Sequence, residues 1–191
     1  AQSQGNLDDL IESDELDTIV AAVEQGRTVY SNIRKTIRFL LSTNFSEIEV
    51  MLVGTALGTG APLSPMQLLW INLVTDIFPG LALSMEAAEP DVLKQPPRNP
   101  YEPIITRESL TRTGAESAVI SVGTLGAFFY GLQRYGPGLQ AGTLAFTTLT
   151  SAQLLHAYSC RSEHETLLDQ ASRRRPRNRK LDLAVGVSLA L

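Results

Sequence analysis

The chain has 191 residues, a formal net charge of −4 and a single cysteine, Cys160. The small negative charge gives no signal of nucleic-acid binding, and one cysteine cannot form a disulfide within the chain. Residues 1–18 are acidic and lack the apolar core that a cleavable signal peptide needs. If the protein enters a membrane, we therefore expect its own apolar segments to direct it there. Cys160 is expected to be a structural residue near a helix end.

Apolar segments alternate with polar connectors along the chain. Four of them have about the length of a membrane-spanning helix, and they occupy residues 37–58, 66–85, 115–132 and 141–160. The first continues an amphipathic helix that begins near Leu16. A fifth, residues 181–191, is too short to span, which predicts that the chain is a fragment of a longer protein. The pattern predicts an all-α protein, a polytopic transmembrane helical bundle with a cytoplasmic stalk helix at residues 18–36.

The positive charges are sorted between alternate connectors. Of the 16 Lys and Arg residues, 15 lie before the first segment, at its N-terminal end (Arg38), or in the connectors at residues 86–113 and 161–180. Only Arg134 lies in another connector. Because positively charged connectors remain in the cytoplasm, the N-terminus is predicted to be cytoplasmic. A soluble helical interaction module, one alternative, has no reason to sort its charges in this way. The basic run at residues 173–180 could bind nucleic acid or anionic lipid, but we favour a topology anchor and expect no nucleic-acid partner.

The second apolar segment carries polar side chains that are costly in hydrocarbon, which indicates a functional site. Asn72, Thr75 and Asp76 stand at i, i+3 and i+4, so their oxygens are expected on one face of a helix. Pro79 removes the backbone hydrogen bond to the Thr75 carbonyl and favours local unwinding. Carbonyls that are freed beside a carboxylate are typical of cation sites in broken membrane helices.

The first and fourth segments add further polar residues. Asn44 and Glu47 are three residues apart and share a face, whereas Glu49 points away from Glu47. For Glu49 the open interpretations are a protonated side chain, a partner on another span, or the lining of an access path. The fourth segment offers Gln153 and His156, and His156 is interpreted as a packing or hydrogen-bonding residue.

These candidate ligands are carboxylate, carboxamide and hydroxyl oxygens. Such a set suits Ca²⁺, or Mn²⁺, better than Zn²⁺ or Cu⁺, and Mg²⁺ is less natural because it keeps its waters in a rigid octahedron. Polar side chains in membranes also serve as hydrogen bonds between helices. For Thr75 and Gln153 that interpretation is as good as ligation, whereas the charge of Glu47 and Asp76 favours ligation.

Several sequence runs resemble one family in the right order. They are Thr18–Arg27 (TIVAAVEQGR), Arg38–Asn44 (RFLLSTN), Gln67–Asp76 (QLLWINLVTD) and Pro96–Pro103 (PPRNPYEP). The chain resembles the P-type cation-transporting ATPases, calcium-pump branch, from the fifth to the eighth transmembrane helix and the start of the ninth. The resemblance implies a metal-ligand set, which comprises Asn44, Glu47, Asn72, Thr75 and Asp76. Sodium-pump relatives tend to have Asp at the position of Asn72.

The resemblance also bears on the number of ions. Two-site calcium pumps have a Glu ligand on the eighth helix, where this chain has Gln153. Gln153 is therefore a sixth candidate ligand, and its neutral side chain implies that one of the two sites is weakened, as in pumps that move a single Ca²⁺.

By the same resemblance, residues 1–17 are the tail of a cytoplasmic phosphorylation domain and residues 37–191 are a C-terminal transmembrane domain. The chain would be the membrane half of an ATP-driven ion translocase that carries its cation site, with Ca²⁺ as the transported ion. Its expected partners are the lipid bilayer and the N-terminal half of the same pump, which holds the phosphorylation, nucleotide-binding and actuator domains.

The motifs of those N-terminal domains are missing from the chain, so it offers no catalytic or cofactor-binding residue of its own. ATP and Mg²⁺ would act only through the N-terminal domains, and the chain by itself is expected to be inactive as an ATPase. The alternative is a free-standing, non-enzymatic membrane protein that pairs with or regulates a pump. A bacterial plasma membrane is the expected location.

Overall fold

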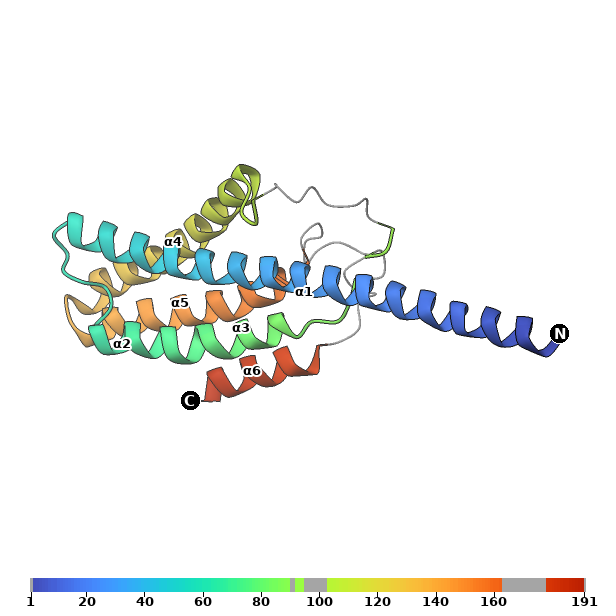
Figure 1. Ribbon diagram of the computed structural model, residues 1–191. Helices are drawn as coiled ribbons and strands as arrows, with labels where there is room; N and C mark the ends of the chain where they lie inside the picture. Colours follow the sequence, from blue (N-terminus) through green and yellow to red (C-terminus); the bar gives the residue numbers. More distant parts are fainter. Residues whose placement is uncertain (1, 90–91, 95–102, 163–177, 191) are drawn as a thin grey trace.

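The computed structural model describes residues 2–89, 92–94, 103–162 and 178–190, with side chains from Asp17 onward. Its elements are α1 (Gln2–Ala56), α2 (Pro65–Trp70), the π-helix η1 (Ile71–Asp76), α3 (Ile77–Ser84), α4 (Arg107–Tyr135), α5 (Leu139–Ser159) and α6 (Arg179–Ala190). The described residues contain helices and no strand, which confirms the all-α prediction. The helices pack side by side, with α2, η1 and α3 forming one continuous rod (Figure 1).

Helix α1 joins the predicted stalk and the first apolar segment into one helix of 55 residues, about 80 Å long at 1.5 Å per residue. Its N-terminal part projects beyond the bundle (Figure 1). The helix begins at Gln2, not near Leu16 as predicted. The physical reason is that no proline precedes Pro62, so nothing interrupts the helical hydrogen bonds over this length.

The connectors meet at two opposite ends of the bundle. At one end the carboxylate of Glu86, which follows α3, forms an ion pair with Arg161 at 2.6 Å. The backbone carbonyl of Glu86 accepts a hydrogen bond from Asn32 at 2.7 Å. At the other end α4 and α5 approach closely, because an added Cβ on Gly131 would lie 2.9 Å from the Ala141 Cα. This alternation of ends is what the predicted order of spans requires.

Two stretches among the described residues are long and apolar enough to cross a membrane, Pro65–Ser84 and Arg107–Tyr135. They contain the predicted segments 66–85, apart from its last residue, and 115–132. The predicted segments 37–58 and 141–160 are largely helical, within α1 and α5, but hydropathy and length do not select those helices. The predicted segment 181–191 coincides with α6 up to Ala190. The polytopic arrangement as a whole therefore stays a prediction.

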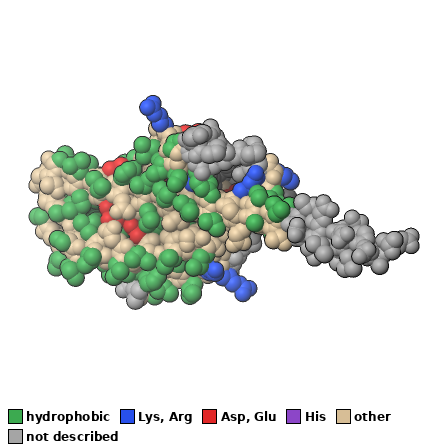
Figure 2. Space-filling view, in the orientation of Figure 1, with side chains coloured by type: hydrophobic (Ala, Val, Ile, Leu, Met, Phe, Trp, Pro, Cys, Tyr) green, Lys and Arg blue, Asp and Glu red, His purple; other side chains and the backbone are tan. Residues whose placement is uncertain are grey.

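Polar and apolar side chains are distributed unlike those of a soluble protein, in which large apolar residues are enriched inside. Leu52, Val119 and Leu155 expose 66%, 74% and 65% of their surfaces, whereas Ser42 and Ser46 are fully buried. Apolar side chains spread over the face in Figure 2, with acidic side chains in a narrow zone among them. Small polar side chains therefore lie between the helices, and many large apolar side chains face outward.

Two apolar clusters frame the middle of the bundle. One contains Phe39 and Leu154, and the other contains Ile71 and Leu149. Along α1 and α5 the polar residues 42–44, 46, 47 and 153 lie at or between these clusters. The candidate site is thus positioned by apolar packing at both of its ends.

Candidate cation site

Residues far apart in the sequence meet where the C-terminal part of α1 lies beside η1 and α5. Asn44 of α1 donates a hydrogen bond from Nδ2 to Asp76 Oδ2 of η1 at 3.3 Å. One turn further along α1, Glu47 Oε2 accepts a hydrogen bond from Asn72 Nδ2 at 3.2 Å. Asn44 and Glu47 stand three residues apart on α1, and Asn72 and Asp76 both belong to η1, so the two hydrogen-bonded pairs are neighbours. The two carboxylates and both asparagines singled out in the sequence therefore form one cluster.

Gln153 brings a third helix to the cluster. Its side chain is fully buried, and Nε2 donates to Glu47 Oε1 at 3.1 Å. Both carboxylate oxygens of Glu47 thus accept from amide groups, one from η1 and one from α5. The same Nε2 also lies 3.4 Å from the Thr43 carbonyl and from Ser46 Oγ. The amide nitrogen of Gln153, rather than its oxygen, faces Glu47.

Three oxygens of the cluster are left without a hydrogen-bond partner among the described residues. They are Thr75 Oγ1, Asp76 Oδ1 and Gln153 Oε1, and all three are buried. A buried acceptor without a partner costs free energy unless a donor or a cation satisfies it. The orphaned oxygens are of the kind that hard cations bind. The residues present therefore fit a hard cation.

The helix that carries Asn72, Thr75 and Asp76 has a local irregularity at these residues. Sequence reasoning expected unwinding before Pro79, but the structure has the π-helix η1 over Ile71–Asp76, followed directly by α3. Wider turns accommodate the missing proline N–H without opening the helix, and π-turns of this kind are frequent at functional sites. Within η1, Thr75 and Asp76 are buried whereas Asn72 is exposed.

Glu49 lies outside this cluster and faces α4. It accepts hydrogen bonds from Ser117 Oγ at 3.0 Å and from Ser121 Oγ at 2.6 Å. Of the three interpretations left open by the sequence, these contacts match a partner on another span.

His156 also behaves as the sequence analysis interpreted it. Its Nε2 lies 2.7 Å from Ser42 Oγ and 3.2 Å from the Sγ of the buried Cys160. The ring stacks beside Phe39 at a centroid distance of 6.4 Å. His156 is therefore a packing and hydrogen-bonding residue that joins α5 to α1.

The sequence analysis missed a buried ion pair between α1 and α4. Arg38 donates from Nε to Glu116 Oε2 at 2.9 Å, and a second bond joins Arg38 to Glu116 Oε1. Arg38 also donates to the Ser162 carbonyl at 3.0 Å, and it is only 8% exposed. The available signal was a carboxylate, Glu116, inside an otherwise apolar segment.

The described residues hold no group of three or more His, Cys, Asp and Glu side chains that could bind a metal. A thiolate or imidazole centre of the kind that Zn²⁺ or Cu⁺ prefers is thus not formed by them. The cluster around Glu47 and Asp76 consists instead of two carboxylates with amide and hydroxyl oxygens. This composition agrees with the ion class expected from the sequence.

Known proteins place the chain in a family. The family described as "Cation transporting ATPase, C-terminus" matches residues 60–191. A calcium-transporting ATPase of Bacillus subtilis is 44% identical over 151 residues, which cover 78% of this chain and 17% of that protein. Calcium-transporting ATPase 1 of Bacillus cereus is 35% identical over 181 residues, covering 86% of this chain and 20% of its own length. A cation-transporting ATPase of Synechocystis is 33% identical over 185 residues, 96% of this chain and 20% of that protein.

The chain therefore belongs to the family of cation-transporting ATPase C-terminal regions, and it is calcium-pump-like in sequence. It spans about a fifth of the length of the curated relatives that it matches.

Proposed function

We propose that the chain is the membrane part of an ATP-driven P-type pump and carries the intramembrane site for its cation, Ca²⁺. The ligands in this proposal are Asn44, Glu47, Asn72, Thr75 and Asp76, with Gln153 as a sixth. The observation that carries the proposal is the set of hydrogen bonds that joins all of these residues except Thr75, from α1, η1 and α5. Thr75 adds one of three buried oxygens that are unpaired among the described residues. The calcium-transporting relatives support the choice of ion.

The hydrogen bonds within the cluster suggest how a cation would enter it. Asn72 and Gln153 present amide nitrogens to Glu47, and these donors would repel a cation. Rotating either amide by half a turn would replace the nitrogen with its carbonyl oxygen, which is a ligand. The hydrogen bonds of the cluster would then be exchanged for bonds to the ion. Protein donors would thus satisfy the Glu47 carboxylate when no cation is bound.

In this proposal the bundle is polytopic, sits in the lipid bilayer and has a cytoplasmic N-terminus. The outward-facing apolar residues, the buried polar ones and the sorting of Lys and Arg support it. The cytoplasmic part of α1 would be the stalk that transmits movement from the phosphorylation domain, in the N-terminal half of the same pump. ATP and Mg²⁺ would act in that half, so the 191 residues alone would not hydrolyse ATP. The membrane would be a bacterial plasma membrane.

The proposal is tested by ATP-dependent uptake of ⁴⁵Ca²⁺ into inside-out vesicles from cells that express the whole gene product. Asp76→Asn keeps the size of the side chain but removes its charge, so the apparent Ca²⁺ affinity should fall at least about tenfold, which corresponds to about 1.4 kcal/mol. Glu49→Gln is the matched control, because it removes a carboxylate from the same membrane region that faces α4 instead of the cluster. It should leave the affinity within about twofold. Equal affinities in wild type and Asp76→Asn would contradict the assigned site.

A further inference from the structure

Pro79 leaves one carbonyl near the cation site without a backbone donor. In an α-helix the carbonyl of residue i accepts from the N–H of residue i+4, and in a π-helix it accepts from residue i+5. Since proline has no N–H, the unpaired carbonyl belongs to Thr75 in an α register and to Val74 in a π register. Pro79 itself lies in α3, which directly follows the π-helix Ile71–Asp76, so the Thr75 and Val74 carbonyls both stand at the change of register. The Val74 carbonyl is the one that meets another helix.

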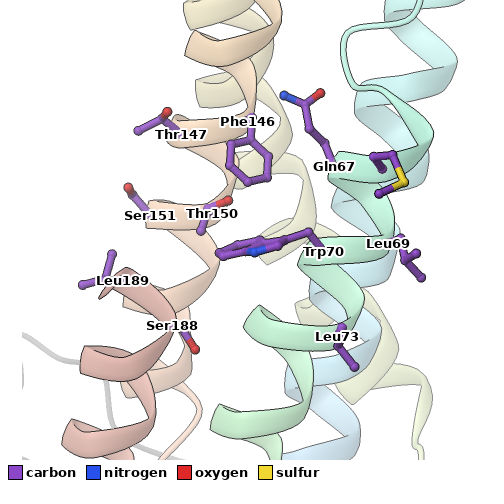
Figure 3. Close-up of a pocket in the computed structure, with 11 residues that line it drawn as sticks. Gln67, Leu69, Trp70, Leu73, Phe146, Thr147, Thr150, Ser151, Ser188 and Leu189 are labelled. Carbon is purple, nitrogen blue, oxygen red and sulfur yellow. The ribbon is translucent and has the colours of Figure 1, made fainter. Parts of the chain in front are cut away.

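A side chain from α6 reaches this carbonyl. Ser188 Oγ donates a hydrogen bond to the Val74 carbonyl oxygen at 3.0 Å. Both residues are buried, with 1% of Ser188 and 7% of Val74 exposed. Figure 3 shows Ser188 on α6 close to the helix that carries Trp70 and Leu73. The hydroxyl gives this carbonyl a donor from a helix more than a hundred residues further along the chain.

The position of Ser188 is set by the way in which α6 is anchored. At the start of α6, Asn178 Oδ1 accepts hydrogen bonds from the N–H groups of Lys180 and Leu181, both at 3.0 Å, which caps the helix. The Asn178 amide also donates to the carboxylate of Glu86, beyond the end of α3. Leu181 and Val185 then pack in the apolar cluster with residues of α3. These contacts hold α6 along the rod formed by η1 and α3.

A cavity lies beside η1 on the side of Leu73. Ser188 lines a cavity of about 650 Å³, together with Trp70, Leu73 and Thr150 (Figure 3). Because space is available beside the π-helix, its side chains could shift into another register. The hydrogen bond from Ser188 is a directional constraint that a cavity wall cannot provide.

We propose that Ser188 is a positioning residue that stabilises the π register of η1 and thereby places Thr75 and Asp76 for the cation. A π-turn adds one residue to a helical turn, so its loss would rotate the residues after it by about 100° relative to those before. Asp76 would then no longer face Asn44 in the same way. The inference deepens the proposed function, on which its cation-binding part depends.

The test uses the whole gene product in lipid nanodiscs and compares Ser188→Ala with Ser188→Thr. Hydrogen exchange of the amides in residues 71–80 is measured first, without Ca²⁺. Ser188→Ala should accelerate that exchange about fivefold, the equivalent of about 1 kcal/mol for one hydrogen bond. Ser188→Thr keeps a hydroxyl and should restore the wild-type rate. Ser151→Ala, which removes a hydroxyl from another wall of the same cavity, is the matched control and should change nothing.

The second measurement is the Ca²⁺ concentration that gives half-maximal ⁴⁵Ca²⁺ uptake. It should rise about fivefold in Ser188→Ala and return toward wild type in Ser188→Thr. An unchanged exchange rate in Ser188→Ala would overturn the role of the hydroxyl. So would a Ser188→Thr variant whose exchange rate and Ca²⁺ affinity change as much as those of Ser188→Ala. If the wild type takes up no Ca²⁺ while the exchange pattern is as expected, the proposed function fails and the structural role of Ser188 stands.

Discussion

The ion pair between Arg38 and Glu116 offers a quantitative test of the packing between α1 and α4. The Arg38 guanidinium has two bonds to the carboxylate and one to the Ser162 carbonyl, and 8% of its surface is exposed. Glu116 is 20% exposed and has a second partner in Arg112, whose Nε lies 3.2 Å from its Oε1. The two residues therefore depend on each other to different extents.

Glu116→Leu would remove the carboxylate that pairs with a guanidinium of which only 8% is exposed. Removal of one partner from a buried ion pair costs about 3–5 kcal/mol in the free energy of unfolding. Arg38→Met should cost about 2 kcal/mol, because Arg112 still compensates the carboxylate. The double variant replaces both charges with apolar side chains and should return to within about 1 kcal/mol of wild type. The coupling energy of the cycle is then about 4–7 kcal/mol.

The assay is unfolding of the 191-residue chain in mixed detergent micelles, followed by helical circular dichroism with each variant at several SDS fractions. Arg107→Met is the control, because it removes an exposed arginine from the same helix, α4. It should change the free energy of unfolding by less than about 0.5 kcal/mol. If the double variant lost as much free energy of unfolding as the two single variants together, the two sites would not be coupled. That result would refute the reasoning that each charge compensates the burial of the other.

Two further pairs of variants test the close approach of α4 and α5 and the contribution of Gln153 to Ca²⁺ affinity. Gly131→Val should lower the free energy of unfolding by about 1–3 kcal/mol in the same assay, because the added atoms collide with the backbone of Ala141. Gly126→Val, on the same helix with open space around it, should have little effect, and equal losses would contradict the close approach of α4 and α5. Gln153→Glu should make Ca²⁺ binding about tenfold tighter, since it adds a carboxylate that faces Glu47. Gln153→Leu should weaken Ca²⁺ binding instead. If both variants took up ⁴⁵Ca²⁺ with the wild-type affinity, Gln153 would not belong to the site.

Much of the candidate site could be predicted because its residues lie at fixed offsets on two helices. Asn44 with Glu47, and Asn72 with Asp76, share helix faces by helical geometry alone, and the structure brings these faces together. The cost of a charge in an apolar segment was a sufficient reason to single out Glu47 and Asp76. The same reasoning, applied to Glu116, would have identified the buried ion pair with Arg38.

Other features could not be predicted because they depend on which helix faces meet. The partners of Glu49 are two serines about 70 residues away on α4, and nothing local distinguishes those serines from other serines of the chain. The prediction of local unwinding before Pro79 was also wrong in detail, because the structure has a π-helix there. A proline indicates that a helical hydrogen bond is missing, but tertiary contacts decide whether the helix opens or widens into a π-turn.

The sequence by itself determined the helical class, the order of apolar segments, the sorting of basic residues and the oxygen character of the candidate ligands. Each of these follows from local spacing or from the cost of placing a side chain in one environment. The tertiary structure alone decided that Gln153 presents its amide nitrogen to Glu47, that Glu49 faces α4, and that Ser188 reaches the Val74 carbonyl. These contacts join residues that are far apart in the chain, so they arise only when the helices pack and buried polar groups must find partners.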